Sequence, residues 1–80
     1  MEYFCDEFRH LVCTPYSKEN LHIMAEELNI KKCWFHKNHY DIPKKRIQEI
    51  KEKCSIVSSM EIVRIIKQNL LNINSNDEQP

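Results

Sequence analysis

The residues that could do the most chemistry lie between positions 33 and 43. This stretch reads CWFHKNHYDIP and holds the only tryptophan and two of the four histidines of the chain. A neutral histidine can hydrogen-bond a base or a ribose, and a protonated one can pair with phosphate. Tyr40 could stack on a base, and Asp41 could accept hydrogen bonds from a ribose. These residue types predict a binding site for a small phosphorylated ligand, such as a nucleotide.

Further polar residues are expected at the same place. In an open parallel sheet, ligands bind outside the carboxyl ends of the strands, where helix N-termini also lie. Polar residues follow each predicted strand, and one histidine falls about one turn into the first predicted helix. We therefore expect a ligand-binding set of Tyr16, His22, His36, Asn38, His39, Tyr40, Asp41, Lys44, Lys45, Ser58 and Ser59.

Lys44 and Lys45 are expected in the first turn of a helix that Pro43 opens. Cations there oppose the helix dipole at a cost of about 0.3 to 1 kcal/mol each. Their placement is explained if a phosphate binds in front of them. The alternative is that both side chains simply extend into solvent.

A metal site is a competing hypothesis for the same stretch. Cys33, His36 and His39 are spaced three residues apart, and His22 could be the fourth ligand of a zinc ion. Alternation along a strand would place Cys33 and His36 on opposite faces, so we assign no metal, no cofactor and no catalytic residue. Two alternatives to ligand binding stay open: metal-assisted hydrolysis of a nucleotide through His22, His39 and Asp41, and a protein–protein inhibitor module.

Alternating strands and helices are expected to position these residues. Ser17 is a good N-cap, and apolar residues follow it at helical spacing, which predicts an amphipathic helix. Ser58 and Glu61 form a capping-box pattern for the last helix. The predicted strands are 10–14, 32–36 and 55–58, and the predicted helices are 18–29, 43–53 and 59–70. This order predicts an α/β domain over residues 1–71, with two or three layers and a short parallel sheet. Residues 1–9 are ambiguous, 39–41 are expected in a polar loop, and 72–80 are expected to be disordered.

Composition limits the class of protein. The 80 residues carry 12 acidic and 12 basic side chains, so the net charge is zero, which argues against binding nucleic acid through bulk basicity. The chain has no apolar run that could span a membrane and no signal peptide, so we expect a cytoplasmic protein. The four cysteines, widely spaced, are expected to be reduced. A small core and a broadly apolar last helix predict a homo-oligomer.

Several motifs in residues 14–66, and His10 before them, resemble a bacterial and phage family known as domain of unknown function 4031. The motifs are Arg9-His10-Leu11, Asn20-Leu21-His22, the run from Trp34 to Asp41, and Ser58-Ser59-Met60-Glu61-Ile62-Val63. His39-Tyr40-Asp41 with the following proline is the most specific of them. Lys37 and Asn38 stand where the family has Gly-Asp. The resemblance implies a bacterial or phage origin but no activity. By analogy with small phage proteins that hide nucleotide immune signals, we expect a phage-encoded anti-defence sponge that acts in the host cytoplasm.

Overall fold

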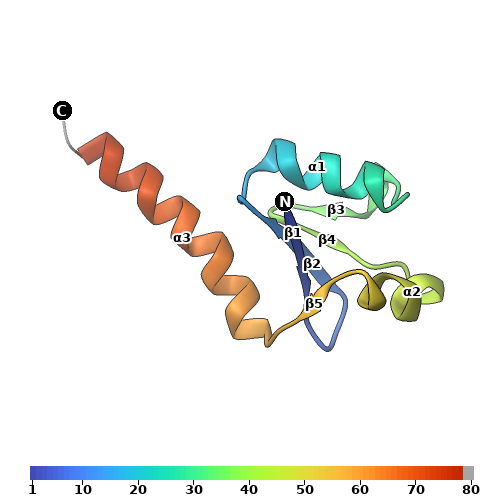
Figure 1. The fold of residues 1–80 in the computed structure, drawn as a ribbon. Helices are drawn as coiled ribbons and strands as arrows, with labels where there is room; N and C mark the ends of the chain where they lie inside the picture. The colour runs from blue at the N-terminus through green and yellow to red at the C-terminus, as the bar shows by residue number, and fades with distance from the viewer. Residues whose placement is uncertain (79–80) are drawn as a thin grey trace.

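The computed structural model describes the backbone of residues 1–78 and the side chains of residues 1–68. Five short strands and three helices, with two single 3-10 turns, form one small mixed domain from which the last helix extends (Figure 1). Their order along the chain is β1 (Glu2–Cys5), β2 (His10–Thr14), α1 (Lys18–Glu27), η1 (Lys32–Trp34), β3 (Phe35–His36), β4 (His39–Asp41), η2 (Lys44–Arg46), α2 (Ile47–Glu52), β5 (Ser55–Ile56) and α3 (Ser59–Glu78).

The strands form one mixed sheet in the order β3-β4-β2-β1-β5. β1 pairs antiparallel with β2, β2 with β4, and β4 with β3, whereas β1 and β5 run parallel. α1 packs against β2 and β4, and α3 packs against β2 and β1. The buried core comprises Cys5, Leu11, Val12, Cys13, Leu21, Met24, Ala25, Leu28, Ile30, Tyr40, Ile42, Ile50, Ile62 and Ile66.

Elements with strong local signals form where the sequence predicts them. The predicted strand 10–14 is β2, with the same bounds. The Ser17 side chain accepts a hydrogen bond from the Asn20 amide at the start of α1, which is the predicted cap. The apolar stripe of that helix is buried. At α3, the Ser58 hydroxyl accepts a hydrogen bond from the Glu61 amide, so this half of the predicted capping box is also formed.

The stretch between α1 and α2 differs from the prediction. Instead of a strand over 32–36 and a polar loop over 39–41, it forms a single 3-10 turn and then a hairpin of β3 and β4. Lys37, in the two-residue turn of this hairpin, has a positive φ of 59°. β4 escaped prediction because its three residues include only one apolar side chain, Tyr40, and because its partner strands are distant or very short.

The predicted parallel sheet is also corrected, since three of the four strand pairings are antiparallel. The ambiguous N-terminal segment forms β1, which is inserted between β2 and β5. β1 and β2 form a hairpin, and β3 and β4 form another, and hairpins connect antiparallel neighbours. The α/β class is retained, with a mixed sheet in place of a parallel one.

α3 extends to Glu78, beyond the predicted end near residue 70. Residues 72–80 were predicted to be disordered. Their side chains, and the backbone of residues 79–80, lie outside the part of the chain that the structure describes. Within the described residues, none of the helices has the length and apolar character needed to cross a membrane.

Candidate functional site

β4 presents different residues on its two sides. Successive residues of a strand point to opposite faces, so His39 and Asp41 share one face while Tyr40 lies on the other. Tyr40 is buried on the side of α1, and its hydroxyl lies 2.7 Å from Nδ1 of His22. His39 and Asp41 are half-buried and lie on the side of α3.

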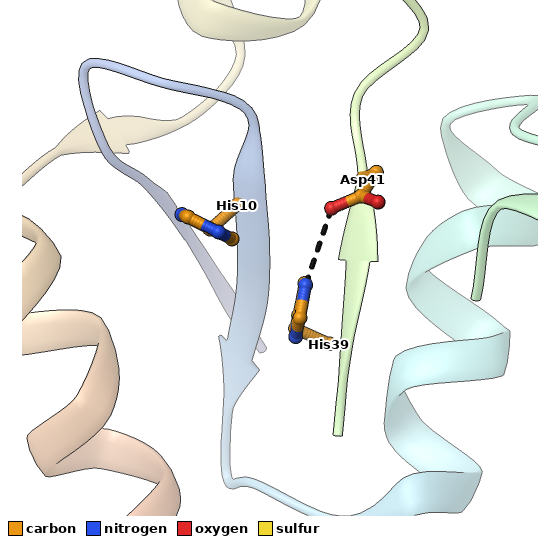
Figure 2. Close-up of side chains that lie close together, drawn as sticks. All are labelled: His10, His39 and Asp41. Carbon is orange, nitrogen blue, oxygen red and sulfur yellow. Dashed lines mark hydrogen bonds and ion pairs between the residues drawn. The ribbon is translucent and has the colours of Figure 1, made fainter. Parts of the chain in front are cut away.

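His10 joins His39 and Asp41 to form a cluster, which we call the β2–β4 cluster (Figure 2). His10 is opposite Asp41 in the antiparallel register of β2 and β4. His39 Nε2 lies 3.1 Å from Asp41 Oδ1, and the rings of His10 and His39 are 5.0 Å apart. One potential ligand atom from each of the three residues lies within 4.8 Å of the others. His10 was not among the predicted site residues.

Asp6 fixes the orientation of His10. This carboxylate is fully buried and accepts hydrogen bonds from the Phe8 and His10 amides, at 2.9 and 3.2 Å. Its other oxygen lies 2.6 Å from His10 Nδ1 and 2.8 Å from the Ser59 hydroxyl. Burial acts to raise the pKa of Asp6, but the hydrogen bonds from His10 and Ser59 outweigh it and keep the pKa below its ordinary value.

It follows that an ionised Asp6 accepts the Nδ1–H of His10, and a neutral His10 then presents the lone pair of Nε2. The same carboxylate closes the turn between β1 and β2. Asp6 was missed because it lies in the N-terminal segment whose structure the sequence left ambiguous. The aspartate itself, whose side chain favours turns by bonding the backbone amide two residues on, is the one local signal that could have indicated it.

His39 is held between two oxygen atoms. Its Nδ1 lies 2.8 Å from Asn38 Oδ1, and its Nε2 lies 3.1 Å from Asp41. Burial lowers the pKa of His39, while the Asp41 carboxylate acts in the opposite direction and His10 reinforces the lowering. The net effect favours the neutral ring, which carries a single N–H.

A cavity of about 300 Å³ lies between this cluster and α3. Polar side chains from the sheet side and both apolar and polar side chains from α3 surround it. The lining residues are His10, Asn38, His39, Ser59, Ile62, Val63, Ile66 and Lys67. Three of these, Asn38, His39 and Ser59, belong to the predicted set. The wall from α3 was missed because its apolar residues were assigned to packing on the sheet and on a second copy of the protein.

Other predicted residues lie apart from this cavity. His22 and Tyr40 line a separate hollow of about 310 Å³ on the α1 side. The Tyr16 hydroxyl donates to the backbone carbonyl of Asn38, at 2.7 Å, and so supports the β3–β4 turn. His36 is exposed, although its ring lies 5.5 Å from that of His39.

Two lysines and a serine complete the predicted set. Lys44 and Lys45 are exposed on η2, and neither lines a cavity described here. Arg46, which follows them, donates to the carbonyls of Leu28 and Asn29 at the C-terminal end of α1. Ser58 caps α3, as described above.

Cysteine plays no part in the β2–β4 cluster. All four cysteines are free thiols, with Cys5 and Cys13 buried and Cys33 exposed. Cys33 and His36, two members of the spacing that suggested zinc, do not join the His10, His39 and Asp41 group. The candidate metal ligands therefore come from two neighbouring strands, β2 and β4, and not from the Cys33–His39 segment.

Comparison with known proteins supplies a family and no activity. No curated protein and no solved structure matches the chain. One family matches residues 4–69, from within β1 to within α3, and this region contains all the residues of the cavity and the β2–β4 cluster. The chain therefore belongs to the family described as Protein of unknown function (DUF4031).

Proposed function

We propose that the protein binds a small phosphorylated ligand, with a nucleotide as the leading class, in the cavity between the β2–β4 cluster and α3. The observation that carries the proposal is the composition of that cavity. Ile62, Val63 and Ile66 form an apolar wall against which a base could lie. Small-molecule sites typically combine such apolar walls with a few convergent polar groups, and their volumes begin near 300 Å³.

The polar side of the cavity suits a nucleotide. His10 can hydrogen-bond a ribose or a base through its free Nε2, and His39 and the Asn38 amide can do so by exchanging a present partner for the ligand. Lys67 supplies a positive charge on the same cavity, where it could pair with phosphate. In this proposal Lys67 takes the role that the sequence suggested for Lys44 and Lys45.

Thermal unfolding with a panel of nucleotides tests the proposal. A ligand that binds only the folded state at a hundredfold excess over its Kd stabilises by about 2.7 kcal/mol. Wild-type protein should therefore gain melting temperature with the correct nucleotide. Lys67→Ala should lose most of this gain, whereas the matched control Lys44→Ala should keep it. If Lys44→Ala loses the gain and Lys67→Ala keeps it, the site lies at η2. If no nucleotide shifts the wild type, the proposal fails.

We further propose that binding serves to sequester the ligand, as the analogy with phage anti-defence proteins suggests. Native mass spectrometry of freshly purified protein addresses this directly, because a sponge should release its ligand intact on denaturation. A turned-over product would instead support catalysis. Absence of any ligand would favour the protein–protein inhibitor.

Metal-assisted nucleotide hydrolysis is the second candidate, and one observation favours it. His10 and His39 of the β2–β4 cluster also line the cavity, and Asp41 lies beside His39. A metal held there would face a bound phosphoester. The test is release of inorganic phosphate from a nucleotide with added Zn²⁺ or Mn²⁺. Activity in the wild type that is lost in Asp41→Ala would establish hydrolysis as the function.

The expected homo-oligomer is also a proposal, and it concerns α3. Met60 and Val63 are 74% and 44% exposed on this helix. We infer that a second copy covers them. Light scattering should show Met60→Glu, a change outside the proposed ligand cavity, as a folded monomer beside an oligomeric wild type. A wild type that is monomeric at micromolar concentration would end this proposal.

A further inference from the structure

We propose that His10, His39 and Asp41 form a mononuclear site for a divalent transition metal of the Zn²⁺ class. The proposal does not depend on nucleotide binding. It rests on the register of two strands, on the hydrogen-bond partners of both imidazoles, and on the position of the group beside a cavity.

The register of β2 and β4 brings the three side chains together. His10 is paired with Asp41 across the two strands, and His39 precedes Asp41 by two residues on the same face. Ligand atoms at about 2.1 Å from a tetrahedral Zn²⁺ lie about 3.4 Å from one another. His39 Nε2 and Asp41 Oδ1 are already 3.1 Å apart, and all three ligand atoms lie within 4.8 Å.

The hydrogen bonds of His10 prepare it as a ligand. The buried Asp6 carboxylate, 2.6 Å from Nδ1, holds the proton on that nitrogen and leaves Nε2 free. Two backbone amides and the Ser59 hydroxyl hold Asp6 itself in place. Metal-bound histidines in proteins usually donate their second N–H to such a carboxylate, which fixes the tautomer and the ring orientation.

The partners of His39 also suit a cation. Asn38 Oδ1 lies 2.8 Å from Nδ1, where it can accept the N–H of a ring that binds a metal through Nε2. Nε2 itself lies 3.1 Å from Asp41 Oδ1, so one dication could take both atoms as ligands, together with a nitrogen of His10.

The ligand set indicates the class of metal. Two imidazoles and one carboxylate suit Zn²⁺ and Fe²⁺, whereas Mg²⁺ and Ca²⁺ prefer oxygen ligands alone. Three protein ligands leave at least one coordination position open, which is typical of catalytic rather than structural zinc. His10 and His39 line the cavity, so a substrate group or water could reach that position from it.

Titration of chelator-treated protein with Zn²⁺ alone, followed by calorimetry, tests the site. Wild type should bind one equivalent. His10→Ala, His39→Ala and Asp41→Ala should each lose stoichiometric binding, with folding checked by circular dichroism. Cys33→Ser and His36→Ala should keep it, because neither residue belongs to the cluster. Asp6→Asn should weaken binding by about 10- to 100-fold, as expected for an outer partner that orients a ligand.

A measurement on the wild type keeps the proposal testable if some variants fail to fold. Co²⁺ in the site should show visible bands of nitrogen and oxygen coordination without a thiolate charge-transfer band. A thiolate band, loss of binding in Cys33→Ser or His36→Ala, or a wild type that binds no Zn²⁺ would overturn the site. Because no nucleotide is present, failure here leaves the nucleotide proposal untouched. Likewise, a protein that binds no nucleotide would leave the zinc proposal untouched.

Discussion

On the face of the sheet that α1 covers, Leu21, Met24 and Ala25 are almost fully buried. The polar groups there, Tyr40 and His22, bond to each other. On the face toward α3, the described part of the helix buries only Ile62 and Ile66. Beside them lie the cavity and the half-buried β2–β4 cluster. The α1 face therefore buries more apolar side chains and pairs its polar groups, although a hollow lies beside His22 and Tyr40, whereas the α3 face keeps a polar cluster beside its cavity.

This difference teaches where stability and binding reside in so small a domain. A well-packed face whose polar groups bond to each other contributes to the free energy of folding, and those groups are less available to a ligand. An incompletely packed face forfeits some of that free energy and leaves side chains that can bind. β4 serves both faces, because its central residue packs on one side and its two outer residues face the other.

The largest expected effect compares one apolar truncation on each face. Leu21→Ala should lower the free energy of unfolding by about 2 to 5 kcal/mol, since it opens a void in the packed face beneath α1. Ile66→Ala should cost about 2 kcal/mol or less, because its side chain borders an existing cavity. Urea unfolding measures both. Equal losses would mean that the α3 face is packed as tightly as the α1 face.

A smaller effect compares two adjacent residues of β4. Tyr40→Phe removes the hydroxyl bonded to His22 and should cost about 1 kcal/mol, with ligand binding unchanged. His39→Ala should also cost about 1 kcal/mol, since it removes the contacts of a half-buried ring, yet it should abolish the nucleotide shift. Thermal melts with and without nucleotide distinguish them. If His39→Ala unfolds the free protein, the role of this residue is structural.

The smallest effect concerns the turn that carries Asn38. Lys37 adopts a φ of 59°, which costs a residue with a Cβ atom about 1 to 2 kcal/mol. Lys37→Gly should relieve this cost, partly offset by the greater entropy of an unfolded glycine, for a net gain of a few tenths to about 1 kcal/mol. The matched control Lys44→Gly, on η2, should not stabilise. A destabilised Lys37→Gly would show that the lysine side chain supports the turn.

The family pattern anticipated this turn better than local propensity did. Glycine is the residue that the resemblance places at position 37, and glycine marks positions where φ is positive. The sequence thus contained an indication of the backbone conformation here. Residues 39–41, however, were expected in a loop and form a strand instead, because β4 pairs with both β2 and β3.

Local signals in the sequence determined β2, α1 and the start of α3. Ser17 and Ser58 cap their helices through contacts within three residues, and the apolar spacing of α1 specifies its buried side. Such features depend on near neighbours, so they could be predicted without the fold. Asn38, His39 and Ser59 do line the cavity, but they were predicted from their residue types and from an expected parallel sheet rather than from these local signals.

Only the tertiary structure decided which residues meet. A parallel sheet would have gathered the site at the carboxyl ends of its strands and left His10, at the amino end of β2, far away. Antiparallel pairing sets the amino end of one strand beside the carboxyl end of its neighbour, so His10 lies opposite Asp41. Asp6 and Ser59, 53 positions apart, meet because they follow β1 and β5, which pair in parallel. Strand pairing is a long-range choice made by the packing of the whole chain, and no local pattern encodes it.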